Sequence, residues 1–402
     1  MVEFFIAIII LLIAARILGE IFQRLKQPAL VGELLSGIII GPSLLGLVET
    51  SEPLQVVTQL GIFFLMFLAG FELHPQEIKK AGRAAAIISF VAFVVPFSGG
   101  AVVSNMLGVP IIPSLFIGLT LAITAVPVNA IVLMEFGMLK SKIGTTVLTA
   151  GVINDILSLI VLGIIIQMAE SGTETFDFSQ LGTSVFTIMI FLSLVVLLGY
   201  IFGQTSERLR QKFSAHMQKL RGRESSFAIM IIAAIGMSLA AEYVGLHFVI
   251  GAFFAGLLIY REIIGHENYE RTSNVLSVIT FGFFAPLFFA FIGLEVNATS
   301  ISGQTIPFFV ILLGVAIGGK IAGSIIGAKI AKFSGPEGRT ISYLMNSRGM
   351  VELVIAMVGL ELGILDLTLF SVVVLIGFAT TIMSPIMARR SLAHIKVSQN
   401  EN

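Results

Sequence analysis

The segment VGELLSGII at 31–39 recurs as IGAFFAGLL at 250–258, with an offset of 219 between Gly32 and Gly251. A second segment, FLMFLAGFEL at 64–73, resembles FFAFIGLEV at 288–296, and its glycines align at an offset of 223. Two apolar helices can look alike simply because both use glycine to pack closely. A nearly constant offset over two segments instead favours an internal repeat.

Composition places most of this chain in lipid rather than in water. Hydrophobic residues make up 56% of the 402 positions, charged residues only 12%, and the mean hydropathy is +1.01. Soluble domains usually carry about 25% charged residues. The 24 Lys and Arg balance the 24 Asp and Glu, so no basic excess indicates nucleic acid. Cysteine is absent, which excludes disulfides, thiolate metal sites and thiol nucleophiles.

Long apolar runs predict an all-α integral membrane protein with about thirteen transmembrane helices. A bilayer core about 30 Å thick needs roughly 20 apolar residues in a helix. Runs of this kind lie near 2–22, 28–47, 54–73, 84–107, 111–135, 143–168, 182–204, 225–243, 247–260, 274–296, 305–330, 340–362 and 366–388.

The loops between these spans alternate in charge. Lys and Arg occur in the odd-numbered gaps and after the last span, whereas the even-numbered gaps carry Glu and Asp but no Lys or Arg. Basic loops stay on the cytoplasmic side of a membrane. The amino terminus is therefore expected outside, and the carboxyl terminus inside, with a short cytoplasmic tail at 389–402. An error of one helix would destroy this alternation, which supports the count.

The repeat is expected to be inverted. It pairs the second span with the ninth and the third with the tenth, so seven spans separate the partners. Because seven is odd, the two copies cross the membrane in opposite directions. Inverted repeats are typical of secondary transporters, whose substrate site lies at the midplane between the copies.

Two predicted spans are interrupted at matching places. The first contains ITAVPVN at 123–129, where Pro127 lacks a backbone donor and disfavours helix before it. About 222 residues later lies MNSRG at 345–349, which brings Asn346 and Ser347 into an apolar span. Broken helices leave free carbonyl and N–H groups that must line protein or water. Matched breaks point to a binding site, although a simple kink at Pro127 is the alternative.

Asp155 is the only aspartate in the interior of a predicted span, since Asp366 is the first residue of 366–388, and it lies near the middle of 143–168. Intramembrane carboxylates are costly and usually functional. Asn154 precedes it, and Thr124 and Lys320 are its expected neighbours. Lys320 lies in the glycine-rich stretch GGKIAG at 318–323. The alternative is a static Asp155–Lys320 pair that only holds helices together.

Arg348 and Glu352 are four residues apart and therefore share one face of a helix. They either brace the broken helix or take part in ion binding, and the sequence leaves both readings open.

The chain resembles the monovalent cation:proton antiporter-2 family over nearly its whole length. The most specific pieces are VIND at 152–155, Gly319-Lys320 and MNSRGMVEL at 345–353. This family includes bacterial sodium/proton antiporters, the membrane domains of potassium-efflux antiporters and plant cation/proton exchangers. The resemblance makes Asp155 the ion-binding aspartate, Lys320 the core lysine and Thr124 the threonine of the unwound helix.

The resemblance also implies an architecture. A single unit over 1–388 would contain a mobile core, formed mainly by spans near 54–168 and 274–362, with an elevator-like movement. The remaining spans would form a dimerisation scaffold, and the protein would be a homodimer.

Two features depart from the family pattern. Electrogenic relatives carry two adjacent aspartates where this chain has Asn154-Asp155, which removes one titratable group and leaves stoichiometry open. Only fourteen residues follow the last span, so we expect no counterpart of the soluble nucleotide-binding domain of potassium-efflux relatives, and any such regulator would be a separate subunit.

We therefore predict a multi-pass antiporter of the cell membrane that exchanges Na⁺ and/or K⁺ for protons, without a cofactor. Asp155 would bind either a proton or a dehydrated cation, with Thr124 and backbone carbonyls completing the coordination. Asn154 would supply a neutral amide, and Lys320 would balance charge or release a proton. The supporting polar core comprises Arg348, Glu352, Asn346, Ser347 and Pro127.

Two other functions make different demands on the sequence. A monovalent cation channel or regulated potassium-efflux pathway would need an open pore, whereas an inverted repeat in one chain favours alternating access. An intramembrane hydrolase needs a nucleophile with a base, paired aspartates or a His–Glu zinc arrangement, and the spans offer none of these. The expected partners are monovalent cations, protons, membrane lipid and a second copy of the chain.

Overall fold

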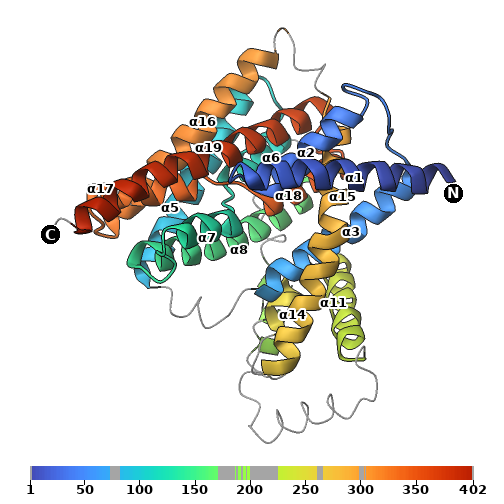
Figure 1. Cartoon of the computed structure of the whole chain (residues 1–402), viewed down its shortest axis with the longest axis horizontal. Helices are drawn as coiled ribbons and strands as arrows, with labels where there is room; N and C mark the ends of the chain where they lie inside the picture. The colour runs from blue at the N-terminus through green and yellow to red at the C-terminus, as the bar shows by residue number, and fades with distance from the viewer. Residues whose placement is uncertain are drawn as a thin grey trace, which may run out of the picture. The chain divides into compact units, whose positions relative to one another are not determined.

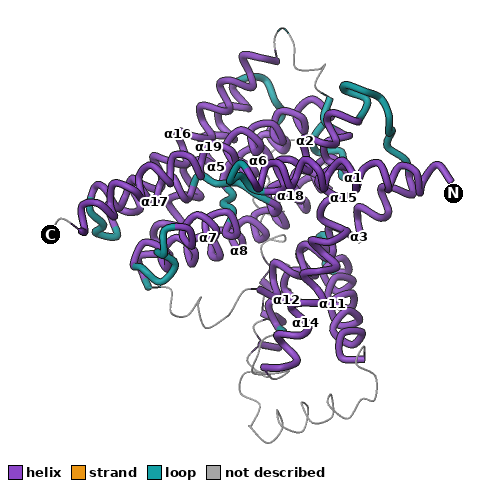
Figure 2. The backbone as a smooth tube through the Cα atoms, in the orientation of Figure 1, coloured by secondary structure: helices purple, strands orange, loops and turns teal. Residues whose placement is uncertain are grey.

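The computed structural model describes residues 2–72, 82–170, parts of 186–199, 225–259, 266–297, 303 and 305–400. Over these ranges the backbone forms helices and loops but no strand (Figure 1, Figure 2). The predicted all-α class is therefore confirmed. Every predicted span overlaps described helical residues, although 182–204 is described only in parts of 186–199.

Eight helices in the described part of the chain are long and apolar enough to cross a membrane. They are α1 (Val2–Arg24), α3 (Glu52–Glu72), α5 (Arg83–Met106), the pair α6 (Ile111–Ala122) and α7 (Val126–Glu135), α8 (Lys142–Glu170), the run of α14 (His266–Ile279), η1 (Thr280–Phe284) and α15 (Ala285–Glu295), α16 (Thr305–Ile330), and α19 (Leu367–Asn400).

A ninth candidate span is a broken one, in which α17 (Gly335–Met345) and α18 (Met350–Glu361) meet at a bend of 43°. Shorter apolar helices include α2 (Ala29–Ile40), α11 (Ser225–Tyr243) and α12 (Phe248–Leu258). The last helix, α19, continues through the expected tail to Asn400. After Pro385 the sequence contains no glycine or proline that would end it.

The chain divides into two compact units. One comprises Met1–Leu54, Ile78–Leu162 and Pro286–Asn402, and the other comprises Gln55–Glu77 and Gly163–Ala285. Every predicted site residue belongs to the first unit.

Glycines allow two close helix crossings in the first unit. A Cβ atom on Gly32 of α2 would lie 2.3 Å from the carbonyl oxygen of Leu18 in α1. A Cβ atom on Gly37 would lie 1.8 Å from the Ala290 carbonyl oxygen and 2.9 Å from the Cα atom of Gly293 in α15. Real Cβ atoms cannot approach so closely, so α2 packs backbone to backbone against both neighbours.

The second unit contains the counterparts of these crossings. A Cβ atom on Gly251 of α12 would lie 2.5 Å from the carbonyl oxygen of Met237 in α11. A Cβ atom on Gly256 would lie 2.9 Å from the carbonyl carbon of Gly70 in α3, and one on Gly70 would lie 1.9 Å from the Phe253 carbonyl oxygen. The glycines in these contacts are the repeat equivalents of those in the first unit: Gly251 and Gly256 correspond to Gly32 and Gly37, and Gly70 corresponds to Gly293. The repeated segments thus share close helix–helix contacts as well as similar amino-acid sequences.

Small residues also bring α16 alongside α5 (Figure 1). A Cβ atom on Gly319 would lie 3.1 Å from the Cα atom of Pro96, and one on Gly323 would lie 2.8 Å from the Val91 carbonyl oxygen. Lys320 lies between these two glycines. The close approach of the two helices therefore carries a lysine into the interior, where it is fully buried.

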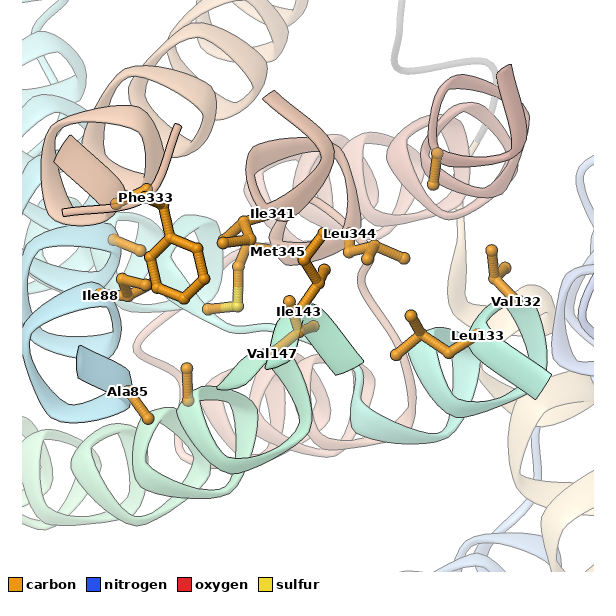
Figure 3. Close-up of a cluster of buried hydrophobic side chains, with 14 of the residues drawn as sticks. Ala85, Ile88, Val132, Leu133, Ile143, Val147, Phe333, Ile341, Leu344 and Met345 are labelled. Atoms are coloured by element: carbon orange, nitrogen blue, oxygen red, sulfur yellow. The ribbon is translucent and has the colours of Figure 1, made fainter. Parts of the chain in front are cut away.

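An apolar cluster holds the halves of the broken helices in place (Figure 3). It joins Ile88 of α5, Val132 of α7, Val147 of α8 and Leu344 of α17, together with Phe333 just before α17. Because α7 and α17 are short, packing of this kind supplies the rigidity that a continuous helix would otherwise give.

We predict that Gly37→Ala destabilises the protein, because the added methyl group would overlap the backbone of α15. Overpacking typically costs about 1–3 kcal/mol, occasionally more, and the first unit offers no flexible side chain to move aside at this contact. Thermal unfolding of the detergent-solubilised protein measures the loss. Gly314→Ala is the matched control, since a Cβ atom there meets nothing within 4 Å. Equal melting temperatures for the two variants would contradict the prediction.

Candidate functional site

Two helices of the first unit are interrupted where the sequence predicts. The chain between α6 and α7 is extended at Ile123–Ala125, and Pro127 sits in the first turn of α7. Proline is tolerated there because its missing N–H would be unpaired in any case. The second break lies between α17 and α18 and includes Ser347 and Gly349. The first interruption is thus an extended segment rather than a kink in a continuous helix.

The two extended segments cross and bond to each other. The Ala125 N–H donates to the Ser347 carbonyl at 2.9 Å, and the Ser347 hydroxyl donates to the Ala125 carbonyl at 3.2 Å. The Thr124 hydroxyl donates to the Met345 carbonyl at 3.1 Å. Ala125 and Ser347 are 222 residues apart. Repeat-equivalent residues that contact each other lie on the axis relating two copies.

Small residues make this crossing possible. A Cβ atom on Gly349 would lie 2.7 Å from the Cβ atom of Ala125. The Asn129 side chain supports the contact from α7, since its Oδ1 atom lies 2.9 Å from the Ser347 hydroxyl and shares that hydroxyl's one hydrogen with the Ala125 carbonyl. Sequence reasoning did not select Asn129, although it lies within the ITAVPVN stretch that marked the break.

Asp155 of α8 is a buried carboxylate whose Oδ1 atom accepts no hydrogen bond from any described residue. Its backbone carbonyl accepts from the Ser158 hydroxyl at 2.8 Å. Lys320 interacts with Asp155 electrostatically. A buried and unpaired carboxylate oxygen is energetically costly, so this atom is placed to take an ion or a proton.

Two buried asparagine side chains, one next to Asp155 in the sequence and one at the second break, also form no hydrogen bonds within the described residues. Asn154 is fully buried, and neither its Oδ1 nor its Nδ2 atom is hydrogen-bonded. Asn346 at the end of α17 has both amide atoms unpaired as well. Buried amides usually make several hydrogen bonds. An unpaired amide oxygen is a neutral acceptor of the kind that a small cation binds.

Two cations cover the carbonyl end of α6. Lys320 donates a hydrogen bond from Nζ to the Ala122 carbonyl. Arg348 donates from one terminal nitrogen to the Thr120 carbonyl at 2.6 Å and from the other to the Leu121 carbonyl at 2.8 Å. These carbonyls belong to the last turn of α6, where no intrahelical donor exists. Positive side chains are favourable at this end of a helix.

Glu352 balances Arg348, with 3.2 Å between its Oε1 atom and the guanidinium. Both side chains are 1% exposed. The Thr381 hydroxyl of α19 also donates to the Arg348 carbonyl at 3.0 Å. A Cβ atom on Gly377 would lie 3.1 Å from both carboxylate oxygens of Glu352, so glycine there makes room for this carboxylate. These contacts hold the start of α18 against α6 and α19, which is a structural role.

A cavity of about 260 Å³ opens beside α7 and reaches from Glu135 to Val128. Arg389 of α19 lines it and binds both Glu135 carboxylate oxygens, at 2.8 and 3.0 Å. The same guanidinium donates to the Lys26 carbonyl at 2.8 Å. Val128 lies three residues beyond Ala125. The cavity therefore approaches the crossing from the end of α7.

Comparison with known proteins assigns the family. Residues 7–393 match the family described as sodium/hydrogen exchanger, transmembrane. The chain belongs to the sodium/hydrogen exchanger family. This result confirms the predicted relationship to monovalent cation/proton antiporters. The exchanger family consists of secondary transporters, so this member is a transporter and not an enzyme.

Relatives of this exchanger cover nearly its full length. It is 30% identical over 387 residues to the Na⁺/H⁺-K⁺ antiporter GerN of Bacillus cereus, covering 96% of each chain. It is 29% identical over 386 residues to a Na⁺/H⁺ antiporter of Enterococcus hirae. The sodium proton antiporter MjNhaP1 of Methanocaldococcus jannaschii has the same fold, with a TM-score of 0.73, 17% identity and coverage of 96% and 97%.

We predict that Arg348→Met strongly destabilises this exchanger. Removing one partner of a buried ion pair costs about 3–5 kcal/mol, and two α6 carbonyls would also lose their donor. Arg348→Lys should destabilise the protein nearly as much, since a single ammonium group cannot replace the planar guanidinium that donates to several acceptors at once. Thermal unfolding in detergent is the measurement. The double variant Arg348→Met/Glu352→Met removes both charges and should recover part of the loss; no recovery would mean that Glu352 does not balance Arg348.

Proposed function

We propose that this chain exchanges a monovalent cation, Na⁺ or K⁺, for protons at Asp155. The observation that carries the proposal is the buried carboxylate of Asp155, whose Oδ1 atom is unpaired within the described residues and whose helix contacts Val126 at the first of two broken helices that cross. Glu352 also has an unpaired oxygen, but its other oxygen is paired with Arg348. Such breaks at membrane depth are typical of secondary transporters. The names of the relatives support the same exchange.

Oxygen atoms would coordinate the cation. Na⁺ and K⁺ are hard ions that prefer carboxylate, carbonyl and hydroxyl oxygens, as Mg²⁺ and Ca²⁺ do. Asp155 would supply the negative charge. The Thr124 hydroxyl donates a hydrogen bond to the Met345 carbonyl, and the lone pairs of its oxygen remain available to the cation. The unpaired amide oxygen of Asn154 would add a neutral ligand.

Competition between ions follows from burial. Removing a carboxylate from water favours its neutral, protonated form. An incoming cation supplies the opposite charge and favours the ionised form. Asp155 would therefore hold either a proton or a cation, but not both, which is the requirement for coupled exchange.

Alternating access would expose this site to one side of the membrane at a time. We propose about thirteen spans with the amino terminus outside, as the loop charges indicate. The mobile core would comprise mainly the spans near 54–168 and 274–362, and the packing of α19 on α17 and α18 adds this helix to the same group. The cavity beside α7 would form the cytoplasmic approach. A second copy of the chain would steady the remaining helices.

Asp155→Asn should abolish exchange, because an amide can neither take up a proton nor neutralise a cation. The assay uses proteoliposomes loaded with a pH dye and carrying an imposed pH gradient, to which Na⁺, K⁺, Li⁺ and Rb⁺ are added in turn. Asp366→Asn is the matched control, since this exposed carboxylate caps α19 by accepting from the Leu369 N–H at 2.8 Å. Exchange that persists in Asp155→Asn would remove Asp155 from the centre of the mechanism.

The same assay separates exchange from other transport. Cation-dependent proton flux that saturates supports the antiporter. Cation currents without any pH response would instead indicate a channel.

Thr124→Val should raise the KM for the cation about tenfold, which corresponds to about 1.4 kcal/mol of lost binding. Valine has the same shape but offers no oxygen. Thr124→Ser should keep a KM near that of the wild type. Thr120→Val is the matched control, because the Thr120 hydroxyl only donates to the Ile117 carbonyl within α6, at 2.8 Å. If both valine variants raised KM equally, Thr124 would not be a ligand.

A further inference from the structure

We infer that Arg389 is a reversible latch between two rigid groups of helices, made in the conformation of this structure and broken when the transport site turns to the other side of the membrane. One group consists of α1, α2 and the turn between them, and the other contains α7 and α19. This inference rests on the proposed function, because it assigns a residue to the alternating access proposed there.

Each group is held together by contacts of its own. In the first, the close approach at Gly32 packs α2 on the backbone of α1. In the second, one apolar cluster contains Val132 of α7 and Ala388 of α19. The Ser384 hydroxyl of α19 also donates to the Tyr343 carbonyl of α17 at 2.6 Å. Helix α19 is therefore expected to move together with α7 and the broken helix.

The border between the groups is apolar where α2 meets α18 and α19. Leu30 and Leu34 of α2 line a small cavity together with Leu353 of α18 and Phe378 of α19. Apolar side chains can slide past one another without losing hydrogen bonds, whereas backbones interlocked at glycines cannot. Relative movement is therefore easier along this border than within either group.

Arg389 crosses this border with directed hydrogen bonds. Its Nε atom and one terminal nitrogen donate to the two Glu135 carboxylate oxygens, at 2.8 and 3.0 Å. The same terminal nitrogen donates to the Lys26 carbonyl at 2.8 Å. Glu135 belongs to α7, and Lys26 belongs to the turn between α1 and α2. Glu135 thus positions the guanidinium, and the Lys26 carbonyl receives it from the other group.

The turn presents this carbonyl in a fixed direction. Lys26 has a φ of +58°, in the left-handed region where glycine is usual. The Gln27 N–H donates to the Phe22 carbonyl at 2.8 Å, which closes the end of α1, and Pro28 follows directly. A rigid acceptor gives the latch a defined closed position.

Partial exposure makes the latch reversible. The Arg389 and Glu135 side chains are 20% and 34% exposed, whereas those of Arg348 and Glu352 are each 1% exposed. Water can replace the bonds of a partly exposed pair, which contributes little to stability. Separating a buried pair leaves an uncompensated charge. Arg348 therefore makes a permanent contact and Arg389 a breakable one.

The latch belongs to the proposed cytoplasmic approach. Lys26, Glu135 and Arg389 all line the cavity of about 260 Å³ beside α7. Movement of the turn relative to α7 changes the walls of this cavity. By holding the turn, Arg389 favours the conformation in which the cavity approaches the crossing from this end.

The first test measures a distance across the border. The chain contains no cysteine, so Leu25→Cys and Ile386→Cys provide the two attachment points for nitroxide spin labels. Both positions are exposed, one beside the turn and one on α19. Pulsed electron paramagnetic resonance in lipid nanodiscs gives the distance distribution. We expect Arg389→Gln to shift the ratio of the two main distances by about twofold to fivefold, the effect of one partly exposed charged contact. An unchanged distribution would overturn the inference.

The neighbouring Arg390 is the matched control, because it is an exposed arginine on the same helix. Arg390→Gln should leave the distances unchanged, and a shift equal to that of Arg389→Gln would refute the latch. Arg389→Lys should give an intermediate shift, since an ammonium group keeps the charge but not the planar array of donors. Thermal unfolding checks that each variant is folded. If Arg389→Gln does not fold, Arg389→Lys and Glu135→Gln test the same contact.

The second test is the KM for the transported cation at each face, measured in right-side-out and everted membrane vesicles. The apparent affinity falls with the fraction of protein in the competent conformation. Arg389→Gln should therefore raise KM at the cytoplasmic face, by up to about fivefold, and should not raise it at the outer face. Equal increases at both faces would contradict a latch.

The outcome is separable from that of the proposed function, because the distance measurement does not require transport. Absence of cation-driven proton flux, or flux that survives Asp155→Asn, would refute the proposed function. Flux that depends on Asp155, together with distances that Arg389→Gln does not alter, would refute the latch alone.

Discussion

Backbone groups released from two helices deep in an apolar bundle must find other partners, and most of the polar structure around the crossing serves this need. Lipid offers no hydrogen bonds, so broken helices persist only where protein or water satisfies them. Here each extended segment bonds to the other through Ala125 and Ser347. The last turn of α6 then relies on Lys320 and Arg348 for its carbonyls. The positively charged side chains of Lys320 and Arg348 thus have a structural role that does not depend on ion transport.

The main features that position the site could be read from the amino-acid sequence. The repeat was visible because glycines at helix crossings tolerate no other residue, so that Gly32 and Gly251 kept their register. Pro127 and the MNSRG stretch marked the breaks because these residues interrupt apolar periodicity. Asp155 stood out because a carboxylate within a span needs a reason to exist. The spacing of Arg348 and Glu352 anticipated their contact.

Other features depend on distances that no pattern encodes. Lys320 was expected beside Asp155, yet its hydrogen bond goes to a backbone carbonyl of α6. Backbone acceptors carry no sequence signal, so this partner became visible only in three dimensions. Asn129 was overlooked for a similar reason: an amide next to a proline break looks like a boundary residue until its oxygen is seen to accept from Ser347. The predicted apolar span ends at 388, whereas α19 continues to Asn400, because residues that are too polar for a membrane span can still favour a helix.

The glycine beside Glu352 has a further consequence. The Ser158 hydroxyl donates to the Asp155 carbonyl, and the Thr380 hydroxyl donates to the Gly377 carbonyl, with the same spacing of three residues. Gly377 also lies 222 residues after Asp155, so the two positions correspond in the repeat. If both halves descend from one duplicated segment, that segment would have placed the same residue at both positions. An aspartate in one half and a glycine in the other would then leave the proposed ion-binding carboxylate without a counterpart in the second half.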